Sequence, residues 1–262
     1  MSAFRTLRVS NPRFERDGLR IVTVKSPALK RRGDLSVFIP QNCPDSVPLV
    51  TLLHGVYGSH WSWSLGGGAH LTAQRLIETG QIKPMVLAMP SDGLWGDGSG
   101  YLPHQQANYE RWIIEDVPAA VAEVVPQVTE ISPRYIAGLS MGGFGTLRLG
   151  GKYAEKFAGI SAHSAITNFK QMAQFVAEPL TEYQADMSDY SAADALISNK
   201  ASLPPLRFDC GTEDPLLNNN RELHKALTSA NVSHTYEEFS GGHEWPYWEE
   251  HIVDSLKFFD QI

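Results

Sequence analysis

One serine stands where it could act as a nucleophile. Ser140 is the centre of the motif GLSMGG at 138–143, which follows the strand-like run RYIA and precedes a run with helical periodicity. The glycines let strand and helix approach closely, and the helix N-terminus beneath the hydroxyl favours developing negative charge. Gly-x-Ser-x-Gly between a strand and a helix is typical of a nucleophile elbow. The sequence therefore predicts Ser140 as the nucleophile of an acyl-transfer reaction.

A serine hydroxyl needs a base, and that base needs a supporting acid. The expected chain order after an elbow serine is acid and then histidine. His243 fits because it stands in the glycine-rich run SGGHEW between a late strand and the last helix. Asp214, in CGTEDPLL at 210–217, follows a strand and lies between the two in the chain; Glu213 beside it is the alternative acid.

An acyl transfer also needs two backbone N–H groups to hold the oxyanion. The residue after the nucleophile, Met141, is expected to supply one. The second is expected from the loop HGVYG at 54–58, which follows the first parallel strand. Val56 is the predicted donor in this loop, and Tyr57 is the alternative.

Aromatic side chains near these motifs predict a cleft for an aromatic or sugar moiety beside a short acyl group. Burial in the core would explain some of them equally well. The predicted substrate-binding residues, all in or next to glycine-rich segments, are Trp61, Trp95, Tyr101 and Trp245.

The elements that must position these residues alternate along the chain. Two β-branched runs, LRIVTVKS and DLSVFIPQ, flank a basic turn and predict an antiparallel hairpin. Short apolar runs typical of buried parallel strands follow, separated by helical segments. These runs are PLVTLLHG, MVLAMP, RYIAGLS, GISAHSA, PLRFDCG and SHTYEEF. The pattern predicts an α/β fold with a mostly parallel central sheet and helices on both faces, ligands binding at the carboxyl ends of the strands.

The organisation expected is a single domain over residues 1–262 with a cap-like insertion at about 168–202. That stretch contains helical pieces but no strand signal. The net charge of −7 argues against a nucleic-acid partner. The lack of a long apolar run argues against a membrane span and favours a cytoplasmic protein. Two cysteines cannot form a metal cage, and neither a metal nor a cofactor is expected.

Together, LLHGVYGSHWSW, GLSMGG, CGTEDPLL and FSGGHEWPYW resemble the esterase D family of α/β hydrolases, with a likeness that runs from about residue 49 to the C-terminus. This family includes S-formylglutathione hydrolases, feruloyl, acetyl and tributyrin-type esterases, and mycolyltransferases. The resemblance implies the α/β-hydrolase fold and metal-free catalysis through an acyl-enzyme on Ser140. It implies a small-molecule ester as the partner and leaves a homo-oligomer open.

Three functions remain open at this stage. The first is a serine carboxylesterase for short-acyl or aromatic-acyl esters. The second is a thioesterase of the S-formylglutathione hydrolase type or an acyltransferase with the same triad, although His54-Gly55-Val56 departs from the loop usual in those thioesterases. The third is an inert binding protein, which the competent residue at every catalytic position argues against.

Overall fold

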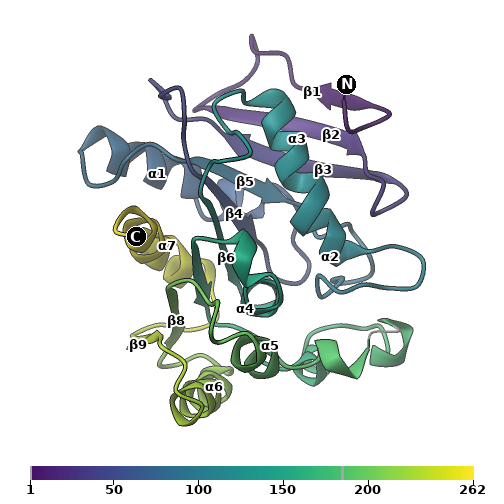
Figure 1. Cartoon of the computed structure of the whole chain (residues 1–262), viewed down its shortest axis with the longest axis vertical. Coiled ribbons are helices and arrows are strands. Elements are labelled where there is room, and N and C mark those ends of the chain that lie inside the picture. Colours follow the sequence, from purple (N-terminus) through teal and green to yellow (C-terminus); the bar gives the residue numbers. More distant parts are fainter. Residues whose placement is uncertain (1, 184–185) are drawn as a thin grey trace.

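The centre of the molecule is a mixed sheet of nine strands in the order β1-β2-β3-β5-β4-β6-β7-β8-β9 (Figure 1). The computed structural model describes residues 2–183 and 186–262. The strands are β1 (Leu7–Val9), β2 (Leu19–Lys25), β3 (Arg32–Phe38), β4 (Leu49–Leu53), β5 (Val86–Pro90), β6 (Arg134–Leu139), β7 (Gly159–His163), β8 (Leu206–Gly211) and β9 (Thr235–Phe239).

The strand directions confirm the α/β-hydrolase prediction. Strands β1, β2 and β3 pair antiparallel, and β3 joins β5 antiparallel, so the predicted hairpin opens the sheet. From β5 and β4 to β9 every pairing is parallel. Strands β4 to β8 are buried along their whole length apart from Arg134, as expected for parallel strands covered on both faces.

Helices cover both faces of this sheet. Side chains of α1 (Ala69–Glu78) and α7 (Trp245–Asp260) pack on one face, together with Val50 and Leu52 of β4. The alternate residues Leu49 and Leu53 point to the opposite face, as the two-residue period of a strand requires. The helices that contribute to that second face are α3 (Val117–Val124), α4 (Met141–Lys152), α5 (Ala192–Ser198) and α6 (Leu217–Ser229).

Short helical turns of other types complete the fold. The helical segment after residue 108 begins as α2 (Tyr109–Arg111) and passes through the π-helix η2 (Trp112–Asp116) before α3. A second π-helix, η1 (Ser62–Gly66), lies in a segment expected to be a glycine-rich loop. The 3-10 helices are η3 (Ala154–Lys156), η4 (Phe169–Gln174), η5 (Leu180–Tyr183) and η6 (Met187–Asp189).

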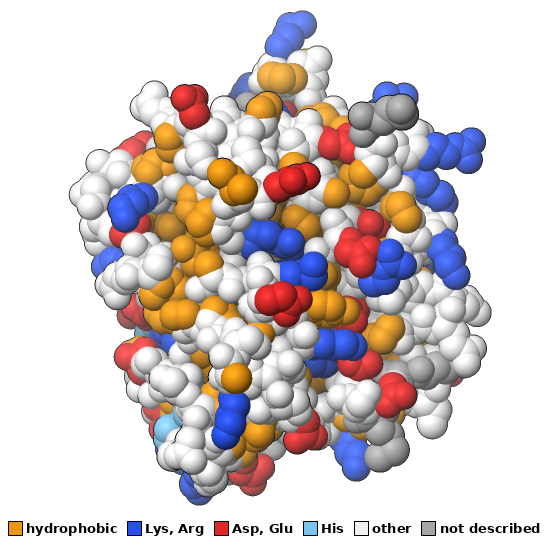
Figure 2. Space-filling model, viewed as in Figure 1, with side chains coloured by type: hydrophobic (Ala, Val, Ile, Leu, Met, Phe, Trp, Pro, Cys, Tyr) orange, Lys and Arg blue, Asp and Glu red, His pale blue; other side chains and the backbone are white. Residues whose placement is uncertain are grey.

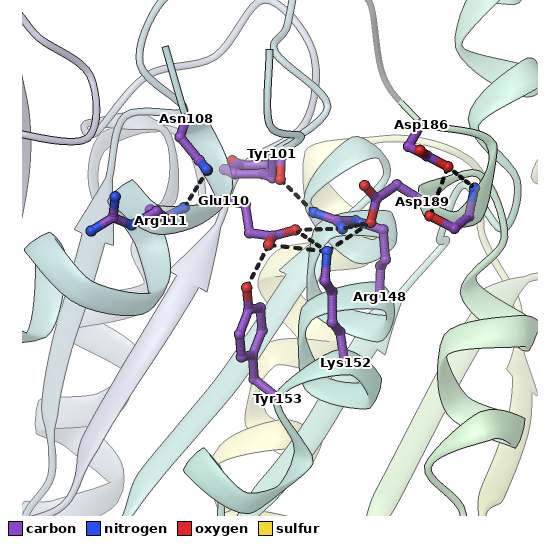
Figure 3. Close-up of polar contacts among 10 residues, drawn as sticks. Tyr101, Asn108, Glu110, Arg111, Arg148, Lys152, Tyr153, Asp186 and Asp189 are labelled. Atoms are coloured by element: carbon purple, nitrogen blue, oxygen red, sulfur yellow. Dashed lines mark hydrogen bonds and ion pairs between the residues drawn. The ribbon is translucent and has the colours of Figure 1, made fainter. Parts of the chain in front are cut away.

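The segment 168–202 lies between β7 and β8 and docks on α4 through a buried ion cluster (Figure 3). The guanidinium of Arg148 in α4 donates to Glu110 at 2.6 Å and to Asp189 of η6 at 2.7 Å. Lys152 contacts the same two carboxylates, and the Tyr153 hydroxyl donates to Glu110 at 2.5 Å. Because Arg148 is 1% exposed, these charges compensate one another out of water. Residues 184 and 185 of the predicted insertion lie outside the described residues.

The surface carries charges of both signs. Figure 2 shows basic and acidic side chains interspersed on one face, with Lys and Arg gathered along the edge where the turn between β2 and β3 lies in Figure 1. Among residues 2–183 and 186–262, no helix combines the length and apolar character that crossing a bilayer requires.

Candidate active site

The turn at Ser140 is sharp and strained. Its φ of 54° and ψ of −119° lie outside the regions that serine favours, at the junction of β6 and α4. The backbones of β6, α4 and β4 approach so closely here that only glycine fits at two positions. A Cβ at Gly138 would collide with the carbonyl of Gly142, and a Cβ at Gly142 would collide with the carbonyl of Leu53 in β4. The motif therefore folds as an elbow that raises Ser140 above the carboxyl end of the sheet.

His243 joins the serine to an aspartate. Its Nε2 lies 2.9 Å from Ser140 Oγ, and its Nδ1 lies 2.8 Å from Asp214 Oδ2. We call Ser140, His243 and Asp214 the outer array. Since a carboxylate can only accept, Nδ1–H donates to Asp214 and the neutral imidazole presents the Nε2 lone pair to the serine hydroxyl. The arrangement has the geometry of a general base next to a nucleophile.

The two candidate acids are separated by the turn after β8. Asp214 Oδ1 accepts from the Leu216 N–H at 2.8 Å, which fixes the carboxylate while Oδ2 faces the imidazole. Glu213 is exposed and accepts instead from the backbone N–H of Gly241 at 2.8 Å. The structure therefore brings Asp214 to His243, and uses Glu213 to hold the glycine loop before it.

The two candidate donors in the loop after β4 differ in whether their N–H groups are already bonded. The Tyr57 N–H donates to the Asp97 carbonyl at 2.8 Å and is occupied. Within the part of the chain that the structure describes, neither the Val56 N–H nor the Met141 N–H has a backbone acceptor. A Cβ added at Gly55 would contact the Ser140 side chain, so the loop passes directly over the serine.

His54 braces this loop. The backbone N–H of Asp92 donates to its Nε2 at 3.0 Å, so Nδ1 carries the proton and lies 2.6 Å from the carbonyl of Gly55. Burial lowers the pKa of His54, while the nearby Asp92 and the Gly55 carbonyl oppose that shift. The imidazole is therefore neutral, as its acceptor role at Nε2 requires.

A cavity of about 340 Å³ opens in front of the serine. Ser140, His243, Trp61 and Trp245 line it, and Val56 and Leu139 add aliphatic surface. Trp248 also lines it but was missed by sequence reasoning; its spacing from Trp245, three residues along one helix face, was the available signal.

Two predicted substrate-binding residues lie elsewhere. Tyr101 is fully buried, and its hydroxyl donates to the His54 carbonyl at 3.0 Å, so it supports the loop at 54–58 and cannot touch a ligand. Trp95 packs against Tyr183 with ring centroids 4.5 Å apart and lines a different cavity. A glycine-rich loop after a strand does not by itself reveal which way its aromatic side chain turns.

Comparison with known proteins agrees with this geometry. The model of the family described as Putative esterase matches residues 26–259. The chain belongs to this family. It is a serine hydrolase with esterase activity and the α/β-hydrolase fold. An acetyl esterase of Caldicellulosiruptor saccharolyticus is 25% identical over 90% of this chain and 96% of its own length.

Solved structures give the same fold. A ferulic acid esterase superposes with a TM-score of 0.79 at 24% identity, covering 99% of both chains. An S-formylglutathione hydrolase of Staphylococcus aureus superposes with a TM-score of 0.74 at 19% identity, covering 96% of this esterase and 98% of that chain.

A second array of the same residue types lies beneath the elbow of the esterase. Ser255 Oγ of α7 lies 2.7 Å from His163 Nε2, and His163 Nδ1 lies 3.0 Å from Asp209 Oδ1. We call Ser255, His163 and Asp209 the inner array. Its three members are fully buried, and Tyr247 and Arg207 contact Asp209 at 2.8 and 2.9 Å. No motif in the sequence predicts this network.

The segment 168–202 contacts the outer array at Phe175. The ring of Phe175 stacks on the imidazole of His243 with centroids 6.0 Å apart, and its carbonyl accepts from the Tyr57 hydroxyl. Asp97 holds the same segment, since its carboxylate accepts from the Ala177 N–H at 2.8 Å. Over residues 2–183 and 186–262, no group of three His, Cys, Asp or Glu side chains is arranged to hold a metal ion.

Proposed function

We propose that this esterase cleaves carboxylic esters with a short or aromatic acyl group, using the outer array to form and hydrolyse an acyl-enzyme on Ser140. One observation carries the proposal. His243 bridges Ser140 Oγ and Asp214 Oδ2 at 2.9 and 2.8 Å, at the mouth of a cavity whose other side chains are aromatic or aliphatic, or belong to serine.

Acylation follows from the positions of the atoms. Ser140 Oγ attacks the ester carbonyl carbon while His243 Nε2 takes the hydroxyl proton, and Asp214 stabilises the imidazolium that results. The carbonyl oxygen becomes an oxyanion that the N–H groups of Val56 and Met141 can hold. Tyr57 does not fit this role, because its N–H is bonded to the carbonyl of Asp97.

Deacylation repeats these steps with water. When the tetrahedral intermediate collapses, the C–O bond to the alcohol breaks and His243 gives its proton to the departing oxygen. A water molecule then loses a proton to His243 and attacks the acyl carbon. The second collapse releases the acid and returns the proton to Ser140.

The cavity argues for the substrate class. A space of about 340 Å³ is at the small end of ligand sites and is too small to hold a long acyl chain with its alcohol. Trp61, Trp245 and Trp248 offer flat apolar surface, which suits an acetyl, butyryl or hydroxycinnamoyl group. The names of the relatives, an acetyl esterase and a ferulic acid esterase, agree with this range.

Turnover of a series of esters tests the proposal. We expect kcat/KM to be highest for p-nitrophenyl acetate or butyrate, or for methyl ferulate, and to fall by at least tenfold for p-nitrophenyl octanoate. Trp61→Ala should raise KM for the aromatic ester, whereas Leu65→Ala, which removes an exposed side chain of the same turn, should not. A rising preference for longer chains would contradict the proposal. Faster cleavage of S-formylglutathione than of any of these esters would favour the thioesterase alternative.

A further inference from the structure

A second and larger cavity lies away from the reaction centre. Its volume is about 480 Å³, and it shares no lining residue with the cavity at Ser140. Segments far apart in the sequence form its walls, namely the turn at 29–31, Trp95, residues 104–107, Tyr109 and Glu182. Most of the lining side chains are polar, in contrast to the apolar cavity at Ser140. The catalytic mechanism makes no use of this site.

Two cations stand at one wall of this cavity. Lys30 and Arg31 belong to the turn between β2 and β3, at the edge where Figure 2 shows basic side chains. An Arg31 Nη2–H donates to the Tyr109 hydroxyl at 2.8 Å, which holds the guanidinium at the cavity. Neither cation forms an ion pair with a carboxylate of the described residues. In a chain of net charge −7, this local positive charge favours an anionic ligand.

A neutral histidine supplies an acceptor. His104 Nε2 lies 3.0 Å from the carbonyl of Ser99, so it must donate its N–H there. Burial lowers the pKa of His104 to about 4, so the imidazole is neutral near pH 7 and Nδ1 keeps its lone pair. Within the described ranges, no protein group donates to that nitrogen. A ligand bound here would gain by offering a hydroxyl proton to it.

The remaining walls define the rest of the ligand. The rings of Trp95 and Tyr109 pack edge-to-face with His104, at centroid distances of 4.7 and 4.6 Å. The amides of Gln105 and Gln106 both donate and accept hydrogen bonds. The carboxylate of Glu182 is a further acceptor and disfavours a ligand with more than one negative charge.

We propose that this cavity binds a hydroxylated carboxylate of the sugar-acid type, with Arg31 and Lys30 on the carboxylate and His104 Nδ1 accepting from a ring hydroxyl. Arginine matches a carboxylate with two parallel N–H donors, and the aromatic rings supply contact for the apolar part of the ligand. A sugar acid of one ring fits within the cavity and matches its polarity.

One loop connects this cavity to the outer array. Trp95 lines the cavity, whereas Gly98, three residues later, packs against Met141 and Val56, so that a Cβ there would contact both side chains. The carboxylate of Asp92 holds the loop by accepting from the N–H groups of Leu94 and Ser99 at 2.9 and 2.6 Å. The ligand is therefore either part of an extended ester substrate or a free effector that reaches the oxyanion loop through this segment.

Binding can be tested without turnover. In the Ser140→Ala background, the indole N–H resonance of Trp95 would be followed by NMR while D-glucuronate is added. We expect a saturable shift. The affinity obtained from it should fall at least tenfold in Arg31→Ala, the loss typical of a charge-assisted hydrogen bond. Arg32→Ala is the matched control. It removes the same charge one residue along the chain, and the Arg32 side chain does not line the cavity. D-glucose, which lacks the carboxylate, should bind at least tenfold more weakly.

Three results would overturn the proposal. Equal affinity in the Arg31→Ala and Arg32→Ala proteins, no saturable shift with glucuronate, or tighter binding of inorganic phosphate would each overturn the proposal. Arg31→Lys should keep part of the affinity. Kinetics on the parent protein decides the source of the ligand. If the ligand is a free effector, added glucuronate changes kcat or KM for p-nitrophenyl acetate. If it is part of the substrate, kcat/KM rises only for an ester that carries the sugar acid. The binding measurement uses the Ser140→Ala protein, so its result does not depend on whether the acyl-enzyme proposal holds.

Discussion

A serine, a histidine and an aspartate are hydrogen-bonded in series at two places in this esterase. Ser140 and His243 of the outer array line a cavity, and 18% of the His243 side chain is exposed. The inner array lies beneath it and has no exposed surface at its serine, histidine or aspartate. The two are joined through the backbone, because the Ser140 N–H donates to the carbonyl of His163 at 3.1 Å.

The partners of the two aspartates explain the different roles. In the outer array, His243 is the one side chain among the described residues that hydrogen-bonds to the Asp214 carboxylate, so the proposed role of that charge is to support the imidazole. In the inner array Asp209 is contacted by Arg207 and Tyr247 as well as His163, so its charge is already compensated. The inner array links β7, β8 and α7, the helix that follows His243. The proposed roles of the same residue types therefore differ: the outer array serves chemistry where a substrate can enter, and the inner array holds the fold where none can.

The largest expected difference concerns the two serines. Ser140→Ala should lower kcat for p-nitrophenyl acetate by about 10⁶, the loss typical of removing a triad nucleophile. Ser255→Ala should change kcat by less than tenfold. Intact mass after treatment with a fluorophosphonate would show the adduct on the Ser255→Ala protein and none on the Ser140→Ala protein. Labelling of the Ser140→Ala protein would remove the outer array from the mechanism.

The next comparison separates the two candidate acids. Asp214→Asn should lower kcat by about 10⁴, because the amide favours the wrong tautomer of His243. Glu213→Gln should cost less than tenfold, since Glu213 only accepts from a backbone N–H. Steady-state kinetics on a short ester measures both. The reverse order would assign Glu213 as the acid.

Folding stability should depend more on the aspartate of the inner array than on that of the outer array. Asp209→Ala removes the fully buried one of the two carboxylates that Arg207 contacts and leaves only the half-exposed Glu237. It should lower the free energy of unfolding by about 3–5 kcal/mol, as breaking a buried ion pair does. Urea unfolding at pH 7 measures this change, with Asp214→Asn as the comparison. An Asp209→Ala protein as stable as the parent but unable to react with the fluorophosphonate would give the inner array a catalytic role.

The smallest expected effect is a pH dependence of the difference in unfolding free energy between the parent and Asp209→Ala proteins. Burial acts to raise the pKa of Asp209, but the charge and hydrogen bond of His163 and the charge of Arg207 outweigh it and hold the pKa below its usual value. A lowered folded-state pKa contributes stability above the unfolded value of about 3.9, and this contribution is lost as the pH falls through the folded value. The gap in unfolding free energy between parent and Asp209→Ala proteins should therefore be constant from pH 7 to 5 and narrow below about pH 4. A gap that widens on acidification would contradict the assignment.

Local patterns were enough for the order of elements and for the nucleophile motif. The alternation of short apolar runs with helical runs predicted the parallel sheet, because buried strands must exclude polar residues on both faces. The elbow around Ser140 was predictable because only glycine avoids the collisions between β6, α4 and β4. The strand β1 and the π-helix η1 were missed, since neither has a distinctive pattern.

Tertiary structure alone decided which side chains meet. Asp214 and Glu213 are neighbours in the chain, and only the turn after β8 determines that one faces His243. Trp95 and Trp61 have similar sequence surroundings, yet they line different cavities because packing against Tyr183 turns Trp95 away. The sequence by itself determined the elements and the chemistry available at their ends, because local sterics and hydrophobic periodicity act over a few residues. The inner array, the contact of Phe175 with His243 and the second cavity join segments far apart in the chain, and only folding brings those segments together.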